Sequence, residues 1–84
     1  MTDFEYLAGY FDSDISFPGL SVSPERNVAM FEMEFFTTEG NTYLDGQLRH
    51  VTPGTVLSVC PGTLRHSDLP FRNYYIKIGA GGEE

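Results

Sequence analysis

Apolar and polar residues alternate most regularly over residues 28–36. Successive side chains of a strand point to opposite faces, so Glu32 and Glu34 would share one face, and the other face is wholly apolar. The apolar face consists of Ala29, Phe31, Met33 and Phe35. We therefore predict a strand whose apolar face lies in the core and whose glutamates are solvated. A helix is the alternative, because alanine, methionine and glutamate favour helices, but regular alternation without a capping residue favours the strand.

Pairs of turn residues divide the next part of the chain into short segments. Asp45-Gly46 is typical of a type I′ hairpin, in which both central residues need positive φ. Pro53-Gly54 and Pro61-Gly62 favour further turns, because proline presets φ and glycine accepts positive φ. The predicted strands are residues 42–44, 47–51, 55–60 and 71–78. Turns at such short intervals leave no room for a helix and predict an all-β chain folded as a small antiparallel barrel.

The two ends of the chain lack this regularity. Residues 12–27 contain many turn-forming residues, and residues 1–11 carry aromatic residues that suit either a short strand or a loosely attached arm. Residues 79–84 are rich in glycine and acid, which is typical of a flexible tail. We therefore predict one domain over residues 1–84, with an irregular arm at 1–27, a barrel core at 28–78 and a flexible tail at 79–84.

Composition narrows the class of partner and the compartment. Five Lys and Arg against twelve Asp and Glu give a net charge of −7 over 84 residues, and nucleic-acid affinity depends on basic groups that neutralise phosphates. Cys60 is the only cysteine, so an internal disulfide is excluded and a reducing cytoplasm is favoured. No apolar run approaches the length that spans a bilayer, and the start of the chain lacks the basic segment of a signal peptide. We expect a cytoplasmic protein that contacts neither nucleic acid nor membrane through this segment.

The order of the turn motifs resembles one known family. The matching segments are Gly40, Tyr43-Leu44-Asp45-Gly46, Val51-Thr52-Pro53-Gly54-Thr55, Cys60-Pro61-Gly62-Thr63, His66 and Pro70-Phe71-Arg72-Asn73-Tyr74-Tyr75-Ile76. Gly9-Tyr10 and Arg26, upstream of the first strong strand, also fit. In this order and spacing the chain resembles the N-terminal effector domain of AraC-type transcription regulators over residues 6–78. That domain is a cupin-like β-barrel.

The resemblance implies a sensor and not an enzyme. It implies that a small polar effector, such as a sugar, enters the barrel, that the domain forms a homodimer, and that no cofactor takes part. The chain contains no helix-turn-helix, no dimerisation helices and only part of the usual sensor domain. We therefore expect either a piece of a longer regulator or a short stand-alone relative.

Several residues are candidates for contact with an effector. Sugar sites combine an aromatic face with convergent polar groups. The candidate ligand-binding residues are Arg26, Tyr43, His66, Tyr74 and Tyr75. Core packing is the alternative role for the tyrosines, a surface position for Arg26, and a loop end paired with Asp68 for His66. Arg65 has the same two alternatives as Arg26, namely an anchor for an anion or a surface residue.

A metal site is the main alternative. Metal-binding cupins use a His-x-His pair, a glutamate and a later histidine; here Glu32-x-Glu34 stands in place of the pair, and His66 matches the later histidine. Glu32, Glu34 and His66 could hold a divalent ion if that face of the strand points into the barrel, which would imply a stand-alone cupin with isomerase or dioxygenase activity. A structural barrel that acts as an oligomer through its open sheet edges is a third possibility. We expect His50 on the surface and Cys60 as a buried, inert thiol.

Overall fold

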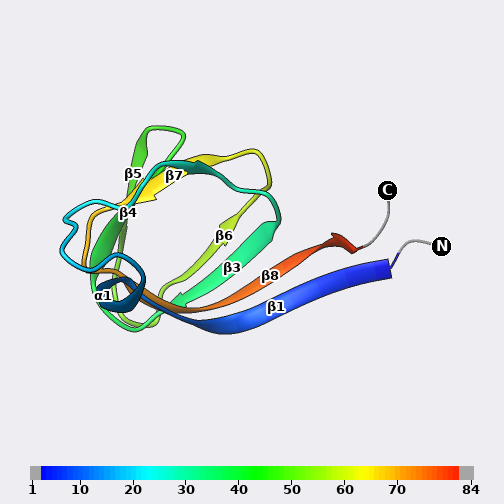
Figure 1. Cartoon of the computed structure of the whole chain (residues 1–84), viewed down its shortest axis with the longest axis horizontal. Helices are drawn as coiled ribbons and strands as arrows, with labels where there is room; N and C mark the ends of the chain where they lie inside the picture. Colours follow the sequence, from blue (N-terminus) through cyan, green and yellow to red (C-terminus); the bar gives the residue numbers. More distant parts are fainter. Residues whose placement is uncertain (1–2, 82–84) are drawn as a thin grey trace.

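The computed structural model describes residues 3–81, which form two antiparallel four-stranded sheets that face each other (Figure 1). The first sheet has the order β1-β8-β3-β6, and the second has the order β2-β7-β4-β5. The first sheet consists of β1 (Asp3–Asp12), β8 (Arg72–Gly81), β3 (Phe31–Phe36) and β6 (Val56–Val59). The second consists of β2 (Arg26–Asn27), β7 (Leu64–Ser67), β4 (Gly40–Leu44) and β5 (Gln47–Val51). The all-β prediction is confirmed.

The predicted turns lie where the chain reverses or changes sheet. Asp45 and Gly46 have φ values of 50° and 80° and close the β4–β5 hairpin, as a type I′ turn requires. Gly54 and Gly62 also have positive φ. Their turns carry the chain from β5 across to β6 in the first sheet and back to β7 in the second. The Pro-Gly turns therefore join the two sheets and do not form hairpins within one sheet.

The N-terminal part differs from the irregular arm expected over residues 1–27. Residues 3–12 form β1, which pairs with β8 from Asp3↔Gly81 to Asp12↔Arg72, so the alternative of a strand applies there. The β1–β8 ribbon extends away from the rest of the barrel (Figure 1). Residues 1–2 and 82–84 lie outside the described part. Of the tail predicted at 79–84, residues 79–81 are described, and they belong to β8.

The short helix α1 (Ser13–Ser16) follows β1 directly. The Asp12 side chain accepts a hydrogen bond from the backbone N–H of Asp14 and caps the helix, as N-cap residues commonly do.

No helix within residues 3–81 has the length and apolar character needed to cross a membrane.

The orientation of β3 is opposite to the predicted one. Glu32 and Glu34 are only 1% and 5% exposed, whereas Phe35 is 39% exposed. The prediction that Ala29, Phe31, Met33 and Phe35 form the core face is therefore wrong, and the strand starts at Phe31 instead of residue 28. Two carboxylates can be buried only when opposite charges and hydrogen bonds compensate them, and the second sheet provides that compensation.

The apolar core is small and lies at one end of the barrel. Phe36, Val51 and Phe71 are buried together, and the rings of Phe36 and Phe71 meet edge to face with centroids 5.1 Å apart. Phe11, Leu57 and Leu69 pack around this cluster. Val28 and Val59 are also buried but lie outside this cluster, and the middle of the barrel is left to polar side chains.

A charged layer joins the two sheets across that middle. Buried Arg65 of β7 donates from Nη1 to Glu32 Oε1 at 3.0 Å and to Glu34 Oε2 at 2.9 Å, and from Nη2 to Glu34 Oε1 at 3.1 Å and to Thr42 Oγ1 at 2.9 Å. Arg26 of β2 adds a two-pronged pair with Glu32 at 3.0 and 3.1 Å. Arg65 was expected either on the surface or as an anchor for an anion. Instead it holds β3 against β7 and β4, with all four of these bonds made inside the barrel.

This arrangement predicts very different costs for removing the two arginines. Arg65→Met leaves two buried carboxylates without their main partner and should lower the free energy of unfolding by about 3–5 kcal/mol. Arg26 is 44% exposed, so solvent screens its pair and Arg26→Met should cost about 1 kcal/mol or less. Urea denaturation followed by circular dichroism measures both.

A compensating variant keeps the comparison informative if Arg65→Met does not fold. Arg65→Leu combined with Glu32→Leu and Glu34→Met removes all three buried charges together, and such apolar replacements are often neutral or stabilising. We expect that variant to recover most of the loss. Equal costs for Arg65→Met and Arg26→Met, or failure of the triple variant to recover stability, would contradict the charged layer as the main link between the sheets.

Candidate functional site

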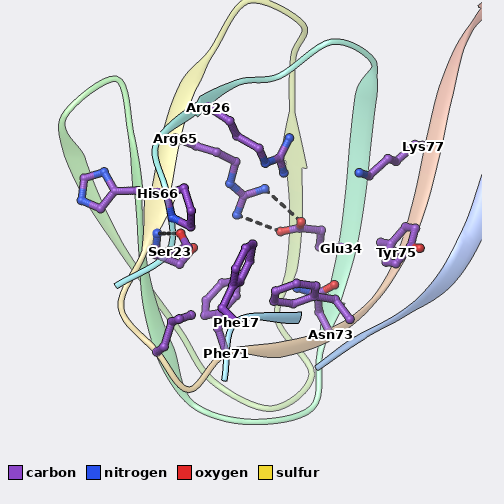
Figure 2. A pocket seen from close by; sticks show the side chains of 14 residues that line it. Phe17, Ser23, Arg26, Glu34, Arg65, His66, Phe71, Asn73, Tyr75 and Lys77 are labelled. Atoms are coloured by element: carbon purple, nitrogen blue, oxygen red, sulfur yellow. Dashed lines mark hydrogen bonds and ion pairs between the residues drawn. The ribbon is translucent and has the colours of Figure 1, made fainter. Parts of the chain in front are cut away.

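A cavity of about 430 Å³ lies between the two sheets, beside the charged layer (Figure 2). Its apolar side is formed by Phe11, Phe17, Pro24, Leu69 and Phe71. Its polar side is formed by Ser23, Arg26, Glu34, Arg65, His66, Ser67, Asn73, Tyr75 and Lys77. The combination of an apolar wall and a few converging polar groups is typical of small-molecule sites, and the volume falls within their usual range.

The segment between α1 and β2 forms one wall of the cavity because hydrogen bonds hold it against β7 and the residues that follow β7. The backbone N–H of Ser23 donates to Ser67 O at 2.9 Å, and the Ser23 hydroxyl accepts from the Ser67 N–H at 2.8 Å. Leu69 N–H donates to Ser21 O at 2.9 Å. These bonds hold Phe17 over the cavity, with its ring centroid 6.1 Å from that of Phe11.

Tyr75 reaches the cavity because β1 has a glycine opposite it. Gly9 pairs with Tyr75, and the Tyr75 hydroxyl lies 2.7 Å from the position that a Cβ on Gly9 would occupy. Any side chain at residue 9 would therefore displace the ring. The Lys77 ammonium lies 5.3 Å from the centroid of the same ring, a distance at which a cation–π attraction acts.

The electrostatics of the cavity favour the ionised form of Glu32 and leave an excess of positive charge. Burial disfavours the ionised form of Glu32, but the hydrogen bonds and charge of Arg26, and then the charges of Arg65 and Lys77, hold its pKa below the ordinary value. With Glu34 bound by Arg65, the layer contains two carboxylates and three cations. Lys77 Nζ is 3.7 Å from Glu32 Oε2, which is beyond normal hydrogen-bond length.

Asn73 has an unused acceptor in the wall of the cavity. The residue is 2% exposed, and its Oδ1 has no hydrogen-bond partner among the described residues. It lies on the same face of β8 as Tyr75 and Lys77 (Figure 2). Buried polar atoms in native proteins are nearly always paired, so an orphaned acceptor in a residue that lines the cavity indicates a place where a bound group can donate.

The five predicted ligand-binding residues are divided between the cavity and the outer surface. Arg26 and Tyr75 line the cavity, and so does His66, but the His66 ring points away from it (Figure 2). That ring stacks on Tyr43 with centroids 4.6 Å apart instead of pairing with Asp68, to which the Tyr43 hydroxyl donates at 3.4 Å. Tyr74 is exposed on the outer face of the first sheet, 4.7 Å from the Tyr10 ring.

The residues of the metal alternative are not arranged as a ligand set. Guanidinium groups take hydrogen-bonding positions of Glu32 and Glu34, and the nearest acid to the His66 ring is Glu25, with Nδ1 and Oε2 3.8 Å apart. Within residues 3–81 no group of three or more His, Cys, Asp and Glu side chains lies close enough to hold a metal ion. The two glutamates do face inward, as that alternative required, but arginine is their counter-charge.

Two further expectations concern single side chains. His50 is on the surface as predicted, where it bonds to Asn41 Oδ1 at 2.7 Å and Glu39 Oε2 at 2.8 Å. Cys60 is exposed, so the prediction of a buried thiol is wrong. Its strand ends at Val59, and Cys60 therefore belongs to the turn that follows.

The residues that sequence reasoning missed are Phe17, Asn73, Lys77 and the inward role of Arg65. Asn73 and Lys77 share one face of β8 with Tyr75, because residues two apart in a strand point to the same side. What was lacking was the direction of that face, and alternation alone does not supply it. The signal that could have found the direction is charge: if Glu32 and Glu34 are buried, an arginine or lysine on the facing sheet must pair with them, and Arg65 does so.

Comparisons with known proteins agree with the architecture. No protein-family model matches the chain, and a search of curated proteins finds no match. Among solved structures, an RmlC-like cupin from Shewanella frigidimarina NCIMB 400 superposes with a TM-score of 0.66 at 16% identity, over 95% of this chain and 69% of that one. A cupin protein from Bacteroides fragilis gives 0.58 at 15% identity, over 100% and 72%. KdgF from Halomonas sp. gives 0.57 at 14% identity, over 98% and 72%.

At such low identity the similarity concerns the fold. The two facing antiparallel sheets, the cavity between them and the superposition on these proteins together show that this chain adopts a cupin-like fold.

Proposed function

We propose that this chain is a non-enzymatic, effector-sensing cupin domain of the AraC type, which binds a small polar ligand inside the barrel and contributes to dimerisation. The observation that carries the proposal is the cavity, where a buried amide acceptor with no partner, an aromatic wall and an excess of cations converge. The turn pattern that resembles AraC-type effector domains supports the sensor role. The interior of the barrel is then built to hold a ligand instead of a packed core.

The state of the carboxylates favours binding over catalysis. Acid–base and metal chemistry both need a carboxylate oxygen that is free to move a proton or to coordinate. Glu32 and Glu34 are instead engaged by Arg26 and Arg65. The alternative of a metal-dependent isomerase or dioxygenase has no comparable observation in its favour.

The outer face of the first sheet supports the dimer. Its outward positions on β1, β8, β3 and β6 align across the strands. They are uncharged except at one end of the β1–β8 pair, where Asp12 and Arg72 form an ion pair. The large side chains exposed there are Tyr6, Tyr10, Phe35, Val56, Tyr74 and Ile78. Continuous exposed apolar surface of this kind usually marks an interface, and two copies of a chain with charge −7 can pair through an uncharged face without bringing their acids together. A second copy related by a two-fold axis is the simplest occupant.

The ligand-binding proposal predicts stabilisation by compounds that enter the cavity. A thermal-shift screen of pentoses, hexoses, polyols and small organic acids should give at least one compound that raises the unfolding temperature, because a ligand at about 100 times its Kd adds about 2.7 kcal/mol. Asn73→Leu should reduce that shift, whereas Leu48→Ala on the exposed β5 strand should leave it unchanged. The compound should be recovered unchanged after incubation.

Two results would contradict this proposal. One is that no compound of the panel changes the unfolding temperature while Asn73→Leu is more stable than the wild type, which would make the cavity a packing defect. The other is that the bound compound is converted in a metal-dependent reaction, which would favour the enzyme.

The dimer proposal predicts a mass twice that of the chain in light scattering. Phe35→Lys and Tyr74→Lys place a charge in the middle of the apolar outer face and should convert the protein to a monomer. Leu48→Lys adds the same charge on the other sheet and should leave the dimer intact. A wild-type monomer at all concentrations measured, or a dimer that survives both lysine variants, would contradict this interface.

A further inference from the structure

The three cationic side chains of the cavity differ in how many hydrogen bonds they make to other residues. Arg65 uses both terminal nitrogens on Glu32, Glu34 and Thr42. Arg26 uses its terminal nitrogens on Glu32 but remains 44% exposed at the mouth. Lys77 makes the 3.7 Å approach to Glu32 and the cation–π contact with Tyr75, and its ammonium donates no hydrogen bond to another residue within 3–81. The positive charge that the two glutamates do not neutralise therefore lies at the end of the cavity formed by Lys77 and Arg26.

The unused acceptor lies at a different place along the same strand. Asn73 and Lys77 are four residues apart on β8, so their Cα atoms are separated by about 13 Å at the usual rise of a strand. The Tyr75 ring lies between them (Figure 2). Phe17 and Phe71 form the apolar wall on the Asn73 side. The cavity thus has a cation at one end, an aromatic and apolar stretch in the middle and a hydrogen-bond acceptor at the other end. A ligand with matching groups would bind in one orientation.

We infer that the cavity takes a small organic acid whose carboxylate binds Lys77 and Arg26, whose apolar middle packs against Tyr75 and the phenylalanine wall, and whose far end donates a hydrogen bond to Asn73 Oδ1. The inference rests on the proposed function, because it assumes that the cavity binds a small molecule. It narrows that function from a polar effector in general to an anionic, amphipathic one. A neutral sugar would satisfy Asn73 but leave the excess positive charge without a partner.

Matched probes separate the three parts of the inference. The compounds are 3-(4-hydroxyphenyl)propionate, 3-phenylpropionate, which lacks the hydroxyl donor, and 3-(4-hydroxyphenyl)-1-propanol, which lacks the carboxylate. Isothermal titration of the full chain should give the tightest binding for the hydroxylated acid. The acid without the hydroxyl should bind about 5-fold more weakly, as for one neutral hydrogen bond, and the alcohol about 10-fold or more weakly, as for a charge-assisted contact.

Two variants assign each effect to its residue. Lys77→Met should weaken both acids about 10-fold while the affinity of the alcohol stays the same. Asn73→Leu should remove the difference between the hydroxylated and non-hydroxylated acids. Arg49→Gln removes a positive charge from exposed β5, away from the cavity, and should change none of the affinities. Circular dichroism confirms that each variant is folded.

The outcomes distinguish this inference from the proposed function. If the alcohol binds as tightly as the hydroxylated acid, or if Lys77→Met does not affect the acids, the anionic ligand class is wrong while binding in the cavity stands. The same holds if neutral sugars bind in the thermal-shift screen and these acids do not. If neither the acids, the alcohol nor any compound of that screen binds, both the ligand class and the proposed function fail.

Discussion

Burial of two glutamates on β3 is the constraint on which the rest of this structure depends. Glu32 and Glu34 are placed between the sheets, where an uncompensated carboxylate would be very costly. Arg65 reaches them from the opposite sheet and Arg26 from its edge strand. The two sheets are therefore held across their middle by these ion pairs, and the apolar cluster of Phe36, Val51 and Phe71 packs separately from them.

The same orientation of β3 accounts for both the inside and the outside of the molecule. Because side chains alternate along a strand, turning the glutamates inward turns Phe35 and Met33 outward, and the neighbouring β8 strand follows the same rule in its pairing with β3. The interior becomes a polar cavity with an aromatic wall. The exterior of the first sheet becomes an apolar face that ends at the Asp12–Arg72 ion pair. The ligand binding and the dimerisation that we propose both depend on this orientation of β3.

Local chemistry in the sequence predicted the turns and most of the strands. Asp45-Gly46, Pro53-Gly54 and Pro61-Gly62 specify their own backbone conformations, and the structure shows the expected positive φ at each of these glycines. Strand β1 was less predictable, because it depends on pairing with β8, more than sixty residues away. Such long-range pairing leaves little mark on a short, aromatic-rich segment.

The site was harder to predict than the fold for a related reason. Alternation showed that Glu32 and Glu34 share a face, but the direction of that face depended on Arg65, on another strand of another sheet. Charged residues face solvent unless a partner is found, so the usual rule pointed outward. Two of the predicted residues, Arg26 and Tyr75, do line the cavity; both belong to the segments that carry the resemblance as well as to the chemistry of a sugar or anion site.

The pKa of Glu32 tests the central claim most directly, and carboxyl ¹³C NMR during an acid titration of the folded protein measures it. The cations around Glu32 should hold its pKa below the ordinary value of 4.5 in spite of burial. Because the folded pKa is the lower one, the ionised pair stabilises the fold above the unfolded pKa, and this stabilisation is lost as the pH falls through the folded pKa. In Arg26→Met the pKa of Glu32 should rise. A Glu32 pKa at or above 4.5 in the wild-type protein would contradict the account, since it would mean that burial outweighs the arginines and that the charged layer does not hold the sheets together.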